Sequence, residues 1–290
     1  MAYPIVSAPY GLKPVNEVGG LPYAGSTRMI PIASGYNTNL FYGDTVQLSG
    51  GTLVAGAYNC TSSPTSPIAG TIGIFQGVEY TNPGTNQRIR AQYWPAGTVA
   101  QDAVAYVIDD PRTVFKVAVG VQGTSLANSG TTIGYLNETF VGTNVYPLTG
   151  NTGSTTTGDS ALLVTGGAVA SGTSGNVRLA GAAAPFRVLQ LVPDTAVSVA
   201  AVASTSGSST TVTLTAANSA IQPGMQLIAP TGTGSLAGNF ISVVTVSGTT
   251  VTVSSAVTLA SGTAVTFIGY PEVVVTWNNT FHSYTNSAGV

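Results

Sequence analysis

The stretch Phe115-Lys-Val-Ala-Val119 decides how this sequence folds, because its apolar positions recur with a period of two. On an extended strand, Phe115, Val117 and Val119 would lie on one face. The stretch Val273-Val-Val-Thr-Trp277 repeats the pattern near the other end of the chain. Helical spacing of apolar residues is almost absent. Short alternating runs, separated by turn residues about every 8–12 positions, indicate an all-β protein built as a sandwich or a barrel.

Other runs of the same kind extend this pattern along the chain. We expect strands at residues 29–33, 45–48, 73–80, 87–94, 103–108, 114–119 and 186–192. Residues 143–175 are rich in Gly, Thr and Ser, and this composition is typical of a long surface loop with little to pack.

The composition changes again after Asp194. Residues 197–268 contain two aromatic side chains, Phe240 and Phe267, among many Ala, Val, Ser, Thr and Gly. Thr210-Thr-Val-Thr-Leu-Thr215 resembles Thr249-Thr-Val-Thr-Val-Ser254, either as a weak duplication or as two similar Thr/Val strands. We therefore predict a small inserted β-sandwich (Ig-like) module at residues 196–268. The main β domain would comprise residues 31–195 plus 269–290, and its choice between sandwich and barrel stays open.

The first 30 residues form a third region. Four prolines and four glycines interrupt it, and proline removes a backbone donor, so we expect an extended N-terminal arm rather than a ladder strand. The arm also carries apolar and aromatic side chains, which need a surface to cover them. Docking on its own domain and docking on a neighbouring subunit are both open alternatives.

Reactive side chains are scarce, because charged residues make up 6% of the 290 positions. General acids, bases and nucleophiles come mostly from His, Cys, Asp, Glu and Lys. The single histidine, His282, is expected at a strand end, and the single cysteine, Cys60, as a small buried hydrophobe. Asp109-Asp110-Pro111 indicates a turn first and a calcium site second. We expect no enzyme activity, no cofactor and no bound metal.

The distribution of charge and hydropathy also limits the classes of partner that we expect. Among the eight Lys and Arg residues, only Arg88 and Arg90 are close neighbours, so no basic patch for nucleic acid is expected. No uninterrupted apolar run approaches the ~18–20 residues of a membrane helix. The N-terminus lacks the basic and apolar regions of a secretory signal. We therefore expect neither nucleic acid nor membrane as a partner, and no signal peptide.

Several phrases, taken in their order, resemble a family of tailed-bacteriophage head decoration, or cement, proteins. The resemblance covers most of the chain outside the inserted module and residues 143–175. The phrases are Tyr10-Gly-Leu-Lys-Pro14, Pro31-Ile-Ala-Ser-Gly-Tyr36, Leu40-Phe-Tyr-Gly-Asp44, Gly73-Ile-Phe-Gln-Gly-Val-Glu-Tyr80, Gln92-Tyr-Trp-Pro95, Ala105-Tyr-Val-Ile-Asp-Asp-Pro111, Phe115-Lys-Val117, Phe186-Arg-Val-Leu-Gln-Leu-Val192 and the final strand, residues 273–282.

The resemblance implies a structural protein of the virion, made in the host cytoplasm, that lies on the outer capsid surface. Its partner would be the major capsid protein, whose capsomers it would cement against the pressure of packaged DNA. A homotrimer, or alternatively a homodimer, would match the local symmetry of capsomer junctions. The arm is the candidate for reaching a neighbour or the shell. Its candidate contact residues are Tyr3, Pro4, Ile5, Val6, Tyr10, Leu12, Pro14 and Val15.

A second interpretation is a glycan-binding adhesin or tail-fibre-like protein, which shares the Gly/Ser/Thr-rich β composition. Aromatic side chains cluster in the first half of the chain, where core packing and an exposed sugar platform are both open. They are Tyr36, Phe41, Tyr42, Phe75, Tyr80, Tyr93, Trp94 and Tyr106. Within the decoration hypothesis, the inserted module would project outward, where its neutral surface would either contact host glycans weakly or shield the particle.

Overall fold

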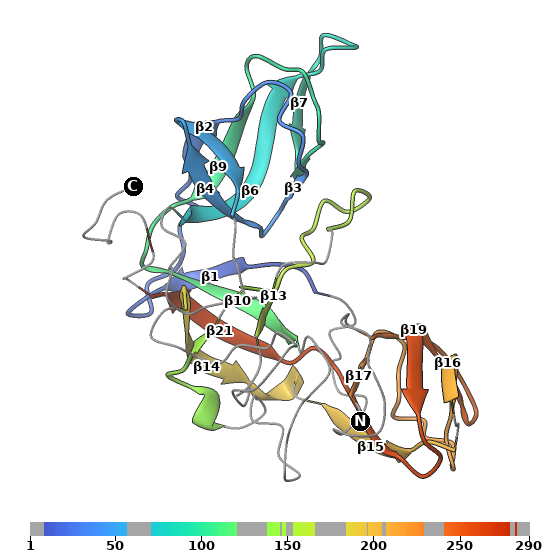
Figure 1. The fold of residues 1–290 in the computed structure, drawn as a ribbon. Coiled ribbons are helices and arrows are strands. Elements are labelled where there is room, and N and C mark those ends of the chain that lie inside the picture. The colour runs from blue at the N-terminus through green and yellow to red at the C-terminus, as the bar shows by residue number, and fades with distance from the viewer. Residues whose placement is uncertain are drawn as a thin grey trace.

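The computed structural model describes residues 9–56, 71–120, 138–145, 147–148, 153–165, 184–195, 197–204, 207–228, 241–278 and 282. The prediction of an all-β protein is confirmed, since these residues form several sheets and no α-helix (Figure 1). Two short 3-10 turns, η2 (Glu138–Phe140) and η3 (Pro193–Thr195), interrupt the strands. Among the described residues, no helix is long and apolar enough to cross a membrane.

The first sheet gathers most strands of the N-terminal half. Its order is β2 (Arg28–Pro31), β9 (Val104–Ile108), β6 (Thr71–Thr81), β4 (Thr45–Ser49) and β5 (Thr52–Ala55), with β7 (Arg88–Ala91) paired to β6. A separate pair joins β3 (Leu40–Phe41) to β8 (Tyr93–Trp94). The run expected at residues 87–94 therefore divides between two sheets. Trp94 is fully buried and meets Tyr80 edge-on, with ring centroids 5.5 Å apart.

A second sheet brings distant parts of the chain together. Its strands are β1 (Lys13–Glu17), β10 (Thr113–Gly120), β21 (Glu272–Trp277), β14 (Phe186–Val192), β11 (Asn144–Val145), β13 (Leu163–Thr165) and β12 (Pro147–Leu148). Here β10 and β21, the two stretches with the clearest alternation, pair antiparallel, with Phe115 opposite Val275. Trp277 packs against Phe115 and Phe186 in the core of this sheet.

These two sheets have separate core clusters that meet along β6 and β9. Ile72, Phe75 and Val78 of β6 belong to the cluster of the first sheet. Ile74 of β6 and Ile108 of β9 belong to the cluster of the second. Strand β6 is therefore buried on both faces, and the region predicted as one main domain contains two clusters joined through a shared strand.

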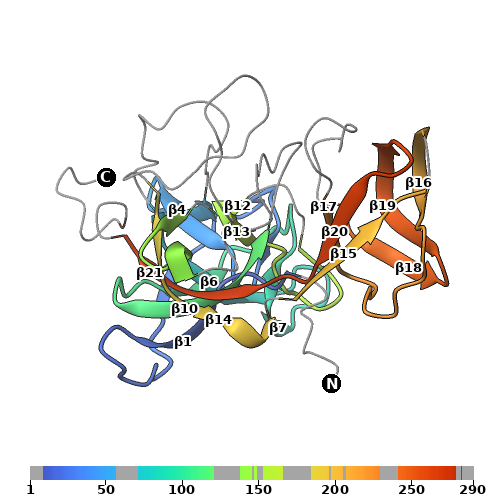
Figure 2. The ribbon, with the colours of Figure 1, turned by 90° about the horizontal axis from the view of Figure 1, so that it is seen from below.

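The inserted region forms two three-stranded sheets of its own. One has the order β15 (Ser198–Val202), β20 (Ala264–Ile268) and β17 (Gln226–Ile228), and the other β16 (Gly207–Thr213), β19 (Thr250–Leu259) and β18 (Val243–Ser247). The buried members of the core that the two sheets share all lie between Ala203 and Phe267. Ser198 lies opposite Ile268, so the chain enters and leaves the module at neighbouring positions (Figure 2).

The pairing within the module also explains the similar Thr/Val stretches. Strands β16 and β19 are antiparallel neighbours, and Val212 lies opposite Val251. Both valines are fully buried, whereas the threonines beside them, Thr211 and Thr252, are not. The likeness therefore follows from two partner strands that supply the same apolar face to one core.

Two sequence-based expectations are wrong. Residues Lys13–Glu17 form a ladder strand, because Pro14 lies opposite Phe115 on an edge strand and next to a register shift, where a missing N–H is tolerated. Residues 143–175 are not a loop without packing in their described part. Leu162 is 7% exposed and Leu163 and Val164 are fully buried, because strand β13 pairs in parallel with β10.

Candidate functional site

Two candidate surfaces share the segment of residues 9–27. One is the turn that follows β1, and the other is a pocket between this segment and the outer face of the first sheet. The start of the segment is anchored by Tyr10, whose hydroxyl donates a hydrogen bond to the carboxylate of Glu272. Burial, followed by this carboxylate, raises the pKa of the Tyr10 phenol well above its usual value. The phenol therefore remains a donor throughout the physiological pH range.

Charged groups surround this anchor. Glu272 is 6% exposed and pairs with Lys116 across 3.1 Å. The Lys13 ammonium lies 4.9 Å from the Tyr10 ring centroid and 3.5 Å from the Asp159 carboxylate. A buried carboxylate needs such partners, because an uncompensated charge in a protein interior is costly. The cluster thus ties the N-terminal segment to the last strand of the second sheet.

Close backbone packing against Gly43 also fixes the next two residues, Gly11 and Leu12. The Leu12 amide donates to the carbonyl of Gly43 across 3.0 Å, and Leu12 is fully buried. A Cβ on Gly11, whose φ is +76°, would lie 2.9 Å from the Gly43 oxygen and 2.7 Å from the Ser160 Cβ. Two phrases that carried the family resemblance, residues 10–14 and 40–44, are therefore in direct contact. Their glycines allow this approach.

The second half of β1 and the turn after it expose three aliphatic side chains. Val15, Val18 and Leu21 are 49%, 50% and 57% exposed. The backbone beneath them is well bonded, since the amide of Glu17 donates to Leu21 and that of Val18 donates to Arg112, each across 2.8 Å. We call residues 15–21 the β1 turn. It is a hydrogen-bonded projection with an apolar surface.

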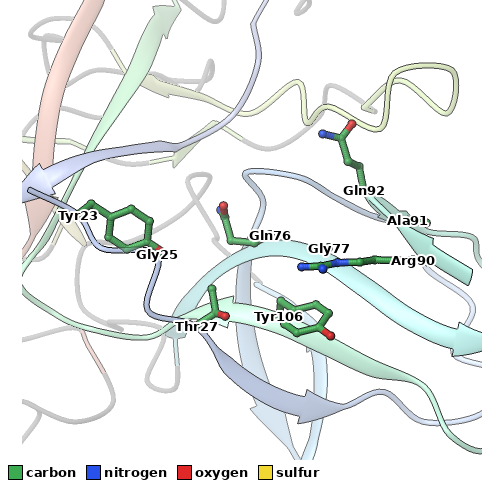
Figure 3. Close-up of a pocket in the computed structure, with 9 residues that line it drawn as sticks. All are labelled: Tyr23, Gly25, Thr27, Gln76, Gly77, Arg90, Ala91, Gln92 and Tyr106. Carbon is green, nitrogen blue, oxygen red and sulfur yellow. The ribbon is translucent and has the colours of Figure 1, made fainter.

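The pocket has a volume of about 470 Å³ and lies beside strands β6, β7 and β9 (Figure 3). Its lining combines aromatic, amide and cationic side chains with two glycines. The lining residues are Tyr23, Gly25, Thr27, Gln76, Gly77, Arg90, Ala91, Gln92 and Tyr106. At Gly77 the register of β6 against β9 shifts, and a Cβ there would lie 2.9 Å from the Ala91 oxygen. Glycine at this bulge therefore allows the backbone of β7 to approach β6 closely.

Hydrogen bonds orient the two tyrosines of the pocket. The Tyr23 hydroxyl donates to the Ser26 carbonyl across 3.0 Å, and that of Tyr106 donates to Glu79 across 2.5 Å. Burial raises the pKa of Tyr23 to about 12. The hydrogen bond to Glu79 raises the pKa of Tyr106 and lowers that of Glu79. Both phenols are therefore neutral at physiological pH, and their hydroxyls are polar groups of the pocket.

The residues considered for catalysis or metal binding make contacts that belong to the packing of the fold. His282 is fully buried and lies 5.1 Å from Trp277 between ring centroids. Asp110 accepts a hydrogen bond from the Arg112 amide across 2.8 Å, as in an Asp-initiated turn, and Asp109 pairs with Arg28 across 3.7 Å. In the described part of the chain, no group of three His, Cys, Asp or Glu residues could hold a metal ion.

We predict that His282 makes stability fall as the pH decreases through about 6.5. Burial lowers the pKa of His282, although a backbone hydrogen bond with Ile72 and the charges of Asp109 and Asp110 act in the opposite direction. Below the unfolded-state pKa of about 6.5, the unfolded chain binds more protons, so the free energy of unfolding decreases by at most about 1.4 kcal/mol per pH unit.

Urea unfolding of the wild type and of His282→Gln between pH 5 and 7.5 measures this effect. The raised pKa of buried Asp44 has the opposite sign, so the difference between the two proteins isolates the histidine. Parallel pH profiles of the two proteins would show that His282 titrates alike in both states.

The structure places the predicted contact residues unequally. Val15 is exposed, Pro14 and Tyr10 are partly buried, and Leu12 is a core residue that is inaccessible to a partner. Tyr3, Pro4, Ile5 and Val6 lie outside the described residues, as does Cys60. Sequence reasoning did not single out Val18 or Leu21 as a site, and of the pocket side chains it considered only Tyr106, as a member of the aromatic cluster. For Val18 and Leu21 the available signal was two aliphatic residues flanking a Gly-Gly turn.

Searches of protein-family models, of curated protein sequences and of solved structures found no match to this chain.

Proposed function

We propose that this protein is a viral structural protein that decorates the outer capsid surface and cements capsomers of the major capsid protein. The ordered phrases that resemble the decoration family motivate this proposal. The observation that carries it is the β1 turn, whose exposed Val15, Val18 and Leu21 rest on a backbone that is hydrogen-bonded to the body of the protein. A partner can cover apolar side chains held in this way with little loss of backbone conformational entropy.

The charges of the described residues are consistent with a role without catalysis. Five cations form ion pairs with carboxylates of the same chain: Lys13, Arg28, Arg88, Arg112 and Lys116. These pairs mostly connect neighbouring strands and turns of one sheet, so the scarce charge is used for contacts within the protein. A cement protein needs rigidity and many modest contacts, which add up through multivalency on a shell.

The proposal includes a finer description of fold and assembly. Two three-stranded sheets over one core support a small Ig-like sandwich for the inserted module, which would point away from the shell. A homotrimer would place three β1 turns around a capsomer junction. Tyr3, Pro4, Ile5 and Val6 are the further contact residues of this proposal.

We predict that charge in the β1 turn weakens shell binding. The double variant Val18→Asp, Leu21→Asp should bind capsids of the virus that carries this sequence at least about tenfold more weakly, because burying an aliphatic side chain contributes about 1.5–3 kcal/mol. Sedimentation of purified protein with capsids that lack it measures the affinity. Cryo-electron microscopy of the decorated capsids would show the position and the oligomer.

The matched control is Val244→Asp in the inserted module, because Val244 has the same exposed fraction as Val18, 50%. This variant should bind as the wild type does. Equal binding of all the variants would remove the β1 turn from the interface. Failure of the wild type to bind capsids at all, or binding only at the tail, would overturn the decoration proposal.

A further inference from the structure

The side chain of Arg90 packs on an aromatic ring but forms no ion pair with a described carboxylate. Its guanidinium lies over the Tyr106 ring, 4.8 Å from the centroid. Within the described part of the chain, no carboxylate lies within ion-pair distance of it, whereas five other described cations have such a partner. Arg187, the remaining described cation, donates to the side-chain oxygen Oδ1 of Asn144 across 3.0 Å.

The carboxylate that faces Arg90 across the ladder already has two other partners. Glu79 lies opposite Arg90 in the β6–β7 ladder, but one of its oxygens accepts from Arg88 and the other from the Tyr106 hydroxyl, each across 2.5 Å. Arg90 lies near enough to help lower the pKa of Glu79. Its own N–H donors are left facing the pocket. A guanidinium stacked on an aromatic ring is oriented in advance for a bidentate contact with a carboxylate.

The other side chains of the pocket can form hydrogen bonds and ring contacts with a polar ring such as a sugar. Figure 3 shows Tyr23 and Arg90 on opposite sides, with Gln76 between them and Thr27 below. Amide and hydroxyl groups can exchange hydrogen bonds with sugar hydroxyls, and a tyrosine ring can cover the C–H face of a sugar. The volume of about 470 Å³ is larger than a single carboxylate needs and is within the range of small-ligand sites.

We propose that this pocket binds a sugar acid, with Arg90 holding the carboxylate and the side chains of Gln76, Thr27 and Tyr23 contacting the ring. An acidic side chain of a protein partner would use Arg90 but would leave the rest of the lining without partners. The site goes beyond capsid decoration and does not depend on it. It also differs from the weak glycan contact expected of the inserted module, since it lies on the first sheet.

D-glucuronate, with D-glucose as its neutral counterpart, tests the proposal in isothermal titration calorimetry or ligand-observed NMR. At about 0.3 kcal/mol per non-hydrogen atom, a ligand of this size should bind with a Kd of ~1 mM. Glucose should bind at least about tenfold more weakly, and added salt should weaken the binding of glucuronate only. Arg90→Gln should reduce the affinity for glucuronate to that for glucose.

Arg187→Gln is the control, because Arg187 is an exposed arginine on a different sheet. It should leave glucuronate binding unchanged. Three results would overturn the proposal: no glucuronate binding at 20-fold the expected Kd, equal binding of glucose and glucuronate, or an Arg90→Gln variant that binds as the wild type does. Tighter binding of a short poly-glutamate peptide than of glucuronate would also overturn it, in favour of an acidic protein partner.

Discussion

Gly73→Ala is expected to destabilise the protein by at least about 3 kcal/mol. Gly73 lies in the middle of the first sheet, between β4 and β9, where a Cβ would be 2.1 Å from the Ile108 oxygen and 2.7 Å from Val107 Cγ1. The first of these contacts is with backbone, which cannot rotate away. The added methyl group must therefore separate β6 from β9, the two strands along which the core clusters meet.

Urea unfolding followed by circular dichroism measures the loss. Gly84→Ala is the matched control, because its Cβ would meet only the Asn82 Oδ1 at 3.4 Å, an ordinary contact distance. The control should change the free energy of unfolding by less than about 0.5 kcal/mol, as surface substitutions usually do. Similar unfolding midpoints for the two variants would show that β6 and β9 are not packed as described.

Trp277→Ala should cost about 3–5 kcal/mol, the usual range for truncating a buried tryptophan. Trp277 is 3% exposed, and its ring centroid lies 4.6 Å from that of Phe186 and 6.2 Å from that of Phe115. Since these residues come from β21, β14 and β10, the cavity would open at the centre of the second sheet. The measurement is again the free energy of unfolding in urea, followed by circular dichroism so that loss of the indole does not remove the signal.

Trp277→Phe separates packing from hydrogen bonding. Among the described residues, the indole N–H of Trp277 finds no acceptor, so phenylalanine removes a buried polar group together with part of the ring. We expect this variant to lose less than half of what Trp277→Ala loses. Equal losses would mean that the N–H, rather than the ring, makes the essential contact.

The candidate surfaces were predictable from the sequence only in part. Val15 was expected in a contact segment and is exposed, whereas Leu12 belongs to the same apolar series and is buried. The difference arises from tertiary packing: Leu12 is covered where its amide donates to the Gly43 carbonyl, whereas Val15 lies at the register shift in the pairing of β1 with β10. A segment rich in proline and glycine does not reveal this pairing, because its partner strand lies about 100 residues further along the chain.

At the pocket, too, the sequence alone does not predict the roles of Arg88 and Arg90. Both alternate outward on β7, and their local sequence does not distinguish them. Arg88 pairs with Glu79, whereas Arg90 covers Tyr106 and faces the pocket. The distinction depends on β6 and β9, which place one carboxylate and one ring beside β7.

The sequence by itself determined the all-β class and the position of many of the longer strands, because a side-chain period of two is a local property of an extended chain. It also indicated a compositionally distinct region, which forms two sheets with their own core. The tertiary structure decided that two core clusters share β6, that β1 joins a sheet, and that one arginine is left facing a pocket. These features depend on which strands become neighbours, and that choice follows from burying apolar faces across long distances in the chain, which no local pattern specifies.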